Sequence, residues 1–537
     1  LYNMSLDIIQ YWPMEGYKPR KSQLEVLNWI QNLPSHIKYI LCEVPVGGGK
    51  SPLGINYSAY LANSLGSSFI LTPQKILQKQ YQDSFDRSRL FSLYGKSNYT
   101  CVPKDTNCDI GSDIKPKCAQ CPHRDAMATM KHSPNIVLNY TLALLLFMLS
   151  PELSLGKREL LVFDECHQLE NHLTEFKALQ IGDKRCRQFK VKSISPKNEY
   201  EAMDWIENTY FPAVKHEYNI LKSVVDEIMN RYERNEAMDK ADADVIGKLK
   251  DIVKHMDVIN HYIKLTRDEL IDNYALIREK TFFKFKPLYG KDIFHEYCKP
   301  MANKFLFMSS TILDKDAYCH DLGIPPNEAA FISIDSEFPI DNRPVFYSPA
   351  MKMTYGWDKD DKKQSRKKMI EKIIEICKTH VDDCGIIHTG SFNVASWLSK
   401  ELEGKISQRI MHHNPDSDYT RDQVIDEFTN NENNEKLLLI SPSITEGLDL
   451  KEDKGRFNII SKIPFPNLSD NWIKRRMELS KEWYTRQAML GVIQATGRTT
   501  RTIEDWSYTY ILDQSFDMLL KMYYKHTPKW FKDSIIR

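Results

Sequence analysis

Short apolar runs that stop at glycine, proline or acidic residues recur along the first part of the chain. They occupy residues 37–46, 67–73 and 159–165, and residues 52–65 between the first two have the spacing of an amphipathic helix. A short apolar run bounded by turn residues is typical of a buried strand. Strands that alternate with helices predict an α/β fold, in which helices cover both faces of a parallel sheet.

The pattern changes between residues 171 and 280. Residues 202–265 keep a helical spacing of apolar positions, carry many charges and contain no glycine before Gly247. Such a segment is typical of helices that pack through one stripe and face solvent elsewhere. We therefore expect an all-helical insertion, after which the sheet pattern returns at residues 303–311.

A second α/β unit is predicted in the last third of the chain. Residues 358–368 are strongly charged, and we interpret them as an exposed linker. Four apolar runs then predict strands, at residues 384–391, 436–443, 456–466 and 506–513. The chain is thus expected to contain two sheet domains, with insertions inside the first.

Composition and charge exclude some classes of protein. The 537 residues are 42% hydrophobic and 27% charged, which is ordinary for a globular protein. The longest apolar run, residues 141–149, is far shorter than the roughly 20 residues of a membrane helix. The first residues lack the pattern of a secretion signal, so we expect a cytoplasmic protein. A net charge of +1 means that any nucleic-acid site must be a local groove.

A glycine-rich segment, EVPVGGGKS at residues 43–51, follows a predicted strand and precedes a predicted helix. Glycines let backbone N–H groups curl around a phosphate, and the helix N-terminus adds a favourable dipole. Lys50 can reach the β- and γ-phosphates, and Ser51 can place its hydroxyl on Mg²⁺. The alternative is a simple glycine turn. The expected phosphate-binding residues are Val46, Gly47, Gly48, Gly49, Lys50 and Ser51.

An acidic pair ends the third predicted strand. The apolar residues before it lead directly into Asp164 and Glu165. After a phosphate-binding loop, such a pair suits Mg²⁺ coordination by Asp164 and activation of water by Glu165. The alternative is an exposed acidic pair without a catalytic role.

Four cysteines, Cys101, Cys108, Cys118 and Cys121, fall within 21 residues. In a cytoplasmic protein such a cluster indicates metal ligands rather than disulfides. Thiolates bind Zn²⁺ or iron–sulfur clusters. A zinc ribbon usually has two close pairs, whereas only Cys118 and Cys121 are close here, so the spacing leaves both metals open. His123 is a further candidate ligand.

Ten short motifs extend over nearly the whole chain. They are YKPRKSQ (17–23), EVPVGGGKS (43–51), LTPQKILQKQY (71–81), YGKSNYTC (94–101), NIVLNYTLALLL (135–146), DECH (164–167), MSSTI (308–312), IIHTGS (386–391), SITEGLDL (443–450) and QATGRTTR (494–501). In this order they resemble the motifs of the XPD/DinG-type iron–sulfur DNA helicases of superfamily 2. A compact phage or bacterial member of that group is the closest interpretation.

The resemblance implies two RecA-like motor domains with ATP between them, and two insertions in the first. The implied first motor domain consists of residues 1–95, 135–170 and 281–345, the cysteine module of 96–134, the helical arch of 171–280 and the second motor domain of 346–537. The insertions that the residue pattern predicts lie where this arrangement requires them.

The resemblance also implies roles for individual residues at the ATP site. Arg20 and Gln23 belong to the motif on the adenine side. Arg498 and Arg501 from the second domain complete the site next to the γ-phosphate, where an arginine stabilises developing charge. The implied catalytic set is Lys50, Asp164, Glu165, Gln494, Arg498 and Arg501, and Glu446 and Asp449 are implied to line the nucleotide site.

The cysteine position between two motor motifs is where XPD-like helicases carry a [4Fe-4S] cluster, and zinc is the alternative. The resemblance further implies single-stranded DNA and duplex junctions as partners. From residue type we expect phosphate contacts from Thr72 and Thr389 and base stacking on Tyr99, whereas Phe465 can pack either on a base or on the core. We therefore expect a monomeric ATP-dependent helicase that moves 5′ to 3′ and separates strands at an iron–sulfur wedge. The alternatives are a translocase or remodelling scaffold without strand separation, and an RNA helicase.

Overall fold

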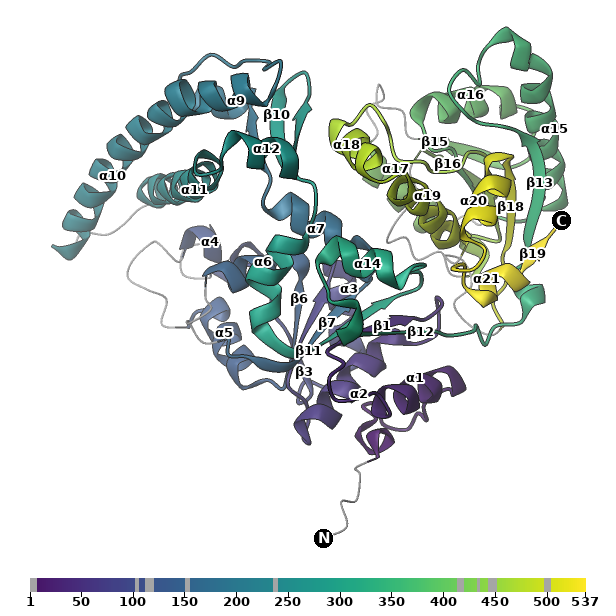
Figure 1. Ribbon diagram of the computed structural model, residues 1–537, viewed down its shortest axis with the longest axis horizontal. Coiled ribbons are helices and arrows are strands. Elements are labelled where there is room, and N and C mark those ends of the chain that lie inside the picture. Colours follow the sequence, from purple (N-terminus) through teal and green to yellow (C-terminus); the bar gives the residue numbers. More distant parts are fainter. Residues whose placement is uncertain are drawn as a thin grey trace.

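The computed structural model describes residues 7–101, 106–111, 120–149, 155–234, 240–412, 420–431, 435–442, 452–496 and 504–537. It contains two lobes, each built on a seven-stranded sheet, and a long helical arm that projects from the first lobe (Figure 1). We call the sheet domains lobe 1 and lobe 2, and the arm the arch. Both large sheets are parallel throughout, as the alternation of strands and helices predicts.

The sheet of lobe 1 has the strand order β12-β1-β11-β7-β2-β6-β3. Its strands are β1 (Tyr39–Glu43), β2 (Ser68–Thr72), β3 (Leu90–Ser92), β6 (Asn135–Asn139), β7 (Arg158–Asp164), β11 (Ala302–Ser309) and β12 (Ala329–Ser333). Its helices are α1 (Lys21–Gln31), α2 (Lys50–Ala62), α3 (Lys75–Ser84), α6 (Tyr140–Leu149), α7 (Leu169–Phe176), α13 (Lys291–Ile293) and α14 (Lys315–Leu322). The predicted strands at 37–46, 67–73, 159–165 and 303–311 are confirmed.

Alternate residues of β1 enter two different cores. Tyr39 and Leu41 pack into the cluster on one face of the sheet, whereas Ile40 and Cys42 pack into the cluster on the other face. All four side chains are buried. A strand covered on both faces has no polar positions, which explains why these strands are continuous apolar runs rather than alternating ones.

The sheet of lobe 2 has the order β15-β16-β14-β17-β18-β13-β19. Its strands are β13 (Val345–Met351), β14 (Gly385–His388), β15 (Arg409–His412), β16 (Leu437–Ser441), β17 (Phe457–Ile460), β18 (Tyr508–Asp513) and β19 (Ile535–Ile536). Its helices are α15 (Lys363–Thr379), α16 (Phe392–Leu402), α17 (Arg421–Thr429), α18 (Asn471–Leu479), α19 (Lys481–Thr496), α20 (Ser515–Tyr523) and α21 (Lys529–Asp533).

The charged segment at 358–368 is not a linker between the lobes. The strand before it, β13, already pairs with β18 in the sheet of lobe 2. The second half of the segment is the first turns of α15. Its charges belong to an exposed connection within lobe 2, residues 358–362, and to the first turns of α15. The interpretation as a linker is therefore wrong.

Two insertions interrupt lobe 1. The described part of the cysteine segment comprises β4 (Thr100–Cys101), β5 (Thr106–Asn107), α4 (Cys108–Gly111) and α5 (Pro122–His132). The arch comprises β8 (Leu179–Gly182), α8 (Asp183–Gln188), α9 (Glu199–Trp205), α10 (Phe211–Glu233), α11 (Lys240–Ile263), α12 (Arg267–Asn273), β9 (Tyr274–Arg278) and β10 (Phe282–Pro287). Helices α10 and α11 form its long hairpin, and α11 also contacts α4.

The arch is not entirely helical, which corrects the expectation for residues 171–280. A three-stranded antiparallel sheet, β8-β10-β9, forms its root next to the lobes. Residues 274–287 are rich in aromatic and β-branched side chains, which favour strands over helices. Strand β10 also extends the arch beyond residue 280. In the part of the chain that the structure describes, no helix is both long and apolar enough to span a membrane.

Candidate functional site

The glycine-rich segment forms a loop between β1 and α2, at the carboxyl edge of the sheet of lobe 1. Gly47 and Gly49 have left-handed backbone angles, with φ of +75° and +71°. A Cβ at Gly48 would lie 2.7 Å from a methyl group of Val44. Helix α2 begins directly after Gly49, at Lys50, so its first N–H groups face the loop. The strand–loop–helix context expected for a phosphate site is present.

Arg20 and Gln23 brace this loop from outside. The Arg20 guanidinium donates to the Gly47 carbonyl at 2.6 Å, and Gln23 Nε2 donates to the Gly49 carbonyl at 2.9 Å. Gln23 Oε1 in turn accepts the backbone N–H of Arg20 at 2.8 Å. The two residues of the adenine-side motif therefore hold the shape of the loop itself.

Asp164 and Glu165 lie opposite the loop, at the end of β7. Lys50 Nζ is 3.2 Å from Glu165 Oε1. His167 Nδ1 is 3.4 Å from Glu165 Oε2 and 2.8 Å from Ser309 Oγ. Glu165 has a φ of +50°, a left-handed conformation that costs a non-glycine residue energy and often marks a functional position. The strained turn directs the carboxylate back towards Lys50.

Burial and charge repulsion control the ionisation of Asp164. The side chain is 5% exposed. Burial and the neighbouring Glu165 raise the pKa of Asp164 to about 6, although Lys50 and a hydrogen bond from Tyr81 Oη at 3.2 Å oppose this shift. Tyr81 also hydrogen-bonds Ser51. A divalent cation next to Asp164 favours its charged form, so the site suits the expected Mg²⁺ ligand pair of Ser51 and Asp164.

A second buried acid, Glu43 at the end of β1, was not predicted from the sequence. It accepts hydrogen bonds from Ile312 N at 2.6 Å, Leu313 N at 2.9 Å and the Ser333 hydroxyl at 2.7 Å. Burial raises the pKa of Glu43, against these three donors. Its role is to fix the loop after β11 beside the glycine-rich loop. In the sequence Glu43 is the first residue of the segment EVPVGGGKS and a charge at the end of an apolar run.

Lobe 2 contributes Gln494 to the same cleft. The cleft has a volume of about 350 Å³ and is lined by Lys50, Ser51, Asp164, Glu165, Ser310 and Gln494, among others. Gln494 is the last residue but two of α19, and its Nε2 atom is buried without a hydrogen-bond partner in the described part of the chain. The structure thus brings one predicted residue of lobe 2 to the predicted phosphate site of lobe 1. Arg498, Arg501, Glu446 and Asp449 lie outside the described residues.

Thr72 and Thr389 are not positioned as the strand contacts that we expected. Both are fully buried. Thr72 donates its hydroxyl to the Gln74 carbonyl at 3.2 Å, and Thr389 donates to the Ser441 carbonyl at 3.0 Å. Each follows or ends a strand, where a hydroxyl satisfies a turn carbonyl more readily than it reaches solvent. In this conformation both hydroxyls are therefore used in hydrogen bonds within the protein.

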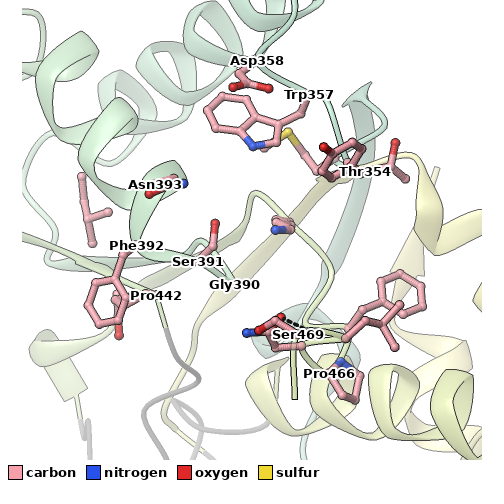
Figure 2. Close-up of a pocket in the computed structure, with 18 of the residues that line it drawn as sticks. Thr354, Trp357, Asp358, Gly390, Ser391, Phe392, Asn393, Pro442, Pro466 and Ser469 are labelled. Atoms are coloured by element: carbon pink, nitrogen blue, oxygen red, sulfur yellow. Dashed lines mark hydrogen bonds between the residues drawn. The ribbon is translucent and has the colours of Figure 1, made fainter. Parts of the chain in front are cut away.

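A larger cavity, of about 1010 Å³, lies at the carboxyl edge of the sheet of lobe 2. Figure 2 shows Trp357 and Thr354 on one side of it, from the segment after β13, and Ser391 and Phe392 on another, from the start of α16. Phe392 is 43% exposed and Tyr355 is fully exposed. Other lining residues are Arg421, Lys462, Phe465, Pro466, Ser469 and Tyr484.

Phe465 faces this cavity and also packs on Tyr484, with ring centroids 5.6 Å apart. Both interpretations of this residue, a base contact and a core contact, are therefore compatible with its position. Tyr99 has a different environment. Its hydroxyl accepts the Tyr94 N–H at 3.2 Å, its ring lies edge-on to His123, and its carbonyl accepts the Cys108 N–H at 2.7 Å. Tyr99 holds the cysteine segment together rather than projecting from it.

Three of the four clustered cysteines belong to the described residues. Cys101 and Cys108 are buried, and the sulfur atoms of Cys108 and Cys121 are 3.8 Å apart. Within the described ranges no group of three or more His, Cys, Asp or Glu side chains has the arrangement of a metal site. Cys118 lies outside those ranges. The 3.8 Å separation equals the edge of a tetrahedron with metal–sulfur bonds of about 2.3 Å, so it fits zinc as well as a packed thiol pair.

The thiols differ in how readily they ionise. Burial and the adjacent Cys121 raise the pKa of Cys108 to about 11, and Cys101 is near enough to add to this effect. For Cys121 burial opposes ionisation, but backbone N–H groups of Arg124 and His123 outweigh it and lower the pKa. Cys121 caps α5, so its thiolate lies at a helix N-terminus. A positive metal centre would favour the thiolate form of all three cysteines.

Two family models match separate parts of the chain. Residues 16–191 match "Type III restriction enzyme, res subunit", and residues 373–534 match "Helicase C-terminal domain". One curated relative, the Fanconi anemia group J protein homolog of Gallus gallus, is 27% identical over 104 residues. That alignment spans 17% of this chain and only 8% of the relative.

Whole-chain similarity is found among solved structures. An XPD helicase structure superposes with a TM-score of 0.62 at 15% sequence identity, over 95% of this chain and 98% of the other. The structure of S. tokodaii Xpd4 superposes with a TM-score of 0.56 at 11% identity, over 96% and 99%. At such identities the likeness concerns the fold, and it extends over both lobes and the arch.

Proposed function

We propose that the chain is an XPD-like helicase of superfamily 2, which hydrolyses ATP to move along single-stranded DNA and to separate the strands of a duplex. One observation carries this proposal. Lys50 and Asp164 of lobe 1 and Gln494 of lobe 2 line a single cleft. A nucleotide held by groups from two lobes couples its hydrolysis to the movement of one lobe against the other.

The residues of the cleft have different proposed roles in ATP hydrolysis. Backbone N–H groups of the glycine-rich loop and Lys50 would hold the phosphates, and Ser51 and Asp164 would hold Mg²⁺, which would supply positive charge to them. Glu165 accepts the proton of the attacking water, and His167 keeps that carboxylate oriented. Gln494 reaches the γ-phosphate side from lobe 2, and Arg498 and Arg501 follow it in the same motif.

The lobe 2 cavity is our candidate for part of the strand path. Its exposed aromatic rings, Tyr355 and Phe392, offer faces on which bases stack, and Arg421 and Lys462 supply positive charge. Base stacking and phosphate contacts are independent of sequence and weaken with salt. RNA offers the same features, so an RNA helicase stays the second candidate.

The cysteine segment and the arch supply the candidate wedge. Helix α11 of the arch contacts α4, which begins at Cys108. The two insertions therefore contact each other, and we propose that one strand passes next to this contact. From the position of Cys101, Cys108, Cys118 and Cys121 between two motor motifs we infer a [4Fe-4S] cluster, whereas the 3.8 Å between the Cys108 and Cys121 sulfur atoms fits zinc, which is the alternative. Iron, acid-labile sulfide and zinc per chain, measured after anaerobic purification, decide between them.

The proposal is tested by two assays on the same preparation. Lys50→Ala should abolish ATP hydrolysis, and single-stranded DNA should stimulate hydrolysis by the unchanged protein. The unchanged protein should open a duplex with a 5′ tail and not one with a 3′ tail. Hydrolysis that survives Lys50→Ala contradicts the site, stimulation without opening favours a translocase, and opening of 3′-tailed duplexes alone reverses the polarity.

A further inference from the structure

A single buried arginine of lobe 2 touches three parts of the molecule. Arg476, on α18, is 2% exposed. Its Nη2 atom lies 3.0 Å from Glu170 Oε1 and 3.2 Å from Asp321 Oδ1, both in lobe 1. Its Nη1 atom donates to the Leu288 carbonyl at 2.9 Å, where the chain returns from the arch to lobe 1. The planar, multiply donating guanidinium suits such a junction, whereas a lysine ammonium does not reproduce its geometry.

The same helix is fastened to the root of the arch. Three side chains of α18 donate to backbone carbonyls there: Asn471 to Leu276 at 2.9 Å, Trp472 to Pro287 at 2.7 Å and Arg475 to Ile271 at 2.8 Å. The Lys286 ammonium also lies 4.2 Å from the centre of the Trp472 ring. The arch is inserted in lobe 1 by sequence, yet lobe 2 binds its base.

Aromatic rings shield the arginine from water. Its guanidinium carbon lies 4.2 Å from the Tyr289 ring centre and 4.8 Å from that of Trp483. Electrostatic contacts strengthen when water is excluded, and a guanidinium over an aromatic face gains a further attraction. The junction is therefore a specific, dry contact and not a surface ion pair.

The cluster also reaches the helices that carry the nucleotide site. Arg486, on α19, pairs with the same Asp321 carboxylate. Helix α19 continues from there to Gln494, whereas Glu170 belongs to α7, which begins just after the segment with Glu165. Asp321 lies on α14, which follows the loop with Ser310. One group of charges thus sets the position of three segments that border the cleft.

We propose that Arg476 is a positioning residue of the motor, which holds the arch root and the Gln494-bearing helix in register with lobe 1. Arg476 lines neither the nucleotide cleft nor the lobe 2 cavity, so it would act through the elements that do. The inference rests on the proposed function only where it concerns catalysis. Its structural part, that lobe 2 anchors the arch, stands independently.

The structural part is tested by a distance measurement that needs no activity. Spin labels carried by unnatural amino acids at Lys254 of α11 and Lys400 of α16, both exposed, report the arch–lobe 2 separation by pulsed electron resonance. We expect one narrow distance distribution for the unchanged protein and a broad one for Arg476→Lys and for Asp321→Asn. Lys474→Ala, which removes an exposed charge from the same helix, should leave it narrow. Narrow distributions in both cluster variants overturn the role of Arg476 in the anchoring, because only the hydrogen bonds of Asn471, Trp472 and Arg475 would then hold the arch root.

The catalytic part is tested by a double-mutant cycle. Arg476→Lys should lower kcat of DNA-stimulated ATP hydrolysis about tenfold and change KM for ATP less than about twofold, because it misplaces a group that acts in the transition state. In the Gln494→Ala variant, Arg476→Lys should lower kcat only a little further, since the effects of substituting two coupled residues are not additive. If the kcat loss of the double variant is the full sum, in free energy, of the losses of the two single variants, the positioning role of Arg476 is overturned. An unchanged protein that DNA does not stimulate would refute the proposed function, and the distance measurement would still decide the anchoring.

Discussion

Replacing Gly49 by alanine tests how strictly the glycine-rich loop depends on its backbone conformation. Gly49 has a φ of +71°, which an alanine adopts only at a cost. A Cβ there would also collide with Gln23 Nε2, the atom that donates to the Gly49 carbonyl. The change therefore introduces strain and displaces a bracing side chain at the same point.

The expected size follows from these two effects. A left-handed conformation costs a residue with a Cβ about 1–2 kcal/mol, and the lost hydrogen bond about 1 kcal/mol. The loop would relax from the shape that binds phosphate at a cost of about 2–3 kcal/mol. At about 1.4 kcal/mol for each factor of ten, nucleotide affinity should fall about 30- to 150-fold.

The control is Gly16→Ala, because Gly16 has a φ of +76° but no atom within 4 Å of the position of a Cβ. This variant should lose stability through strain alone and keep its nucleotide affinity. Affinity is measured by titration with a fluorescent ATP analogue, and stability by thermal unfolding. Adding Gln23→Ala to Gly49→Ala should not restore full affinity, since the strain stays. A Gly49→Ala protein that binds nucleotide within about threefold of the unchanged protein would refute the reasoning.

Three further changes probe buried polar groups. Glu43→Ala leaves three donors unsatisfied and should lower the free energy of unfolding by about 3 kcal/mol or more, measured with urea; a loss below 1 kcal/mol contradicts this. Burial raises the pKa of Glu170 to about 7 from an ordinary value of 4.5; Arg476 opposes this shift and Asp321 adds to it. The folded state then holds the proton more tightly, so stability should fall as pH rises from about 4.5 to about 7, and Glu170→Gln should make this slope in melting curves shallower, whereas an unchanged slope contradicts it. Tyr81→Phe should raise the Mg²⁺ concentration that gives half-maximal ATP hydrolysis about three- to tenfold, because Asp164 loses one hydrogen bond. An unchanged Mg²⁺ titration argues against that contact.

Local sequence order was sufficient to predict the glycine-rich loop between a strand and a helix, and the central strands. Val46 to Ser51 are adjacent in the chain, so strand, glycines and helix can be identified together. Buried parallel strands also carry a strong signal, because both faces are apolar. Short or edge strands such as β3 and β19 have little room for a periodic pattern, and they were not predicted.

Contacts between distant segments were beyond what residue patterns can predict. Thr72 and Thr389 were proposed as phosphate donors from residue type alone, whereas their surroundings use both hydroxyls to satisfy carbonyls. Tyr81 lies within a recognised motif, but only the fold shows that its hydroxyl meets Asp164 from another strand end. Residue type indicates what a side chain can do, and tertiary contacts determine whether it is available to do it.

Arg476 shows what a local residue pattern can predict and what only the tertiary contacts determine. In α18 it stands four residues after the buried Trp472, on the same helix face, and the neighbouring Lys474 is exposed. A charge at a position of the apolar stripe is a signal in the sequence that this side chain is buried and needs a partner. Its partners, Glu170 and Asp321, are about 300 and 150 residues away, and no local pattern links them to it. Short motifs therefore predict the residues of the candidate nucleotide site, whereas the contacts between the lobes and the arch can be seen only in the folded chain.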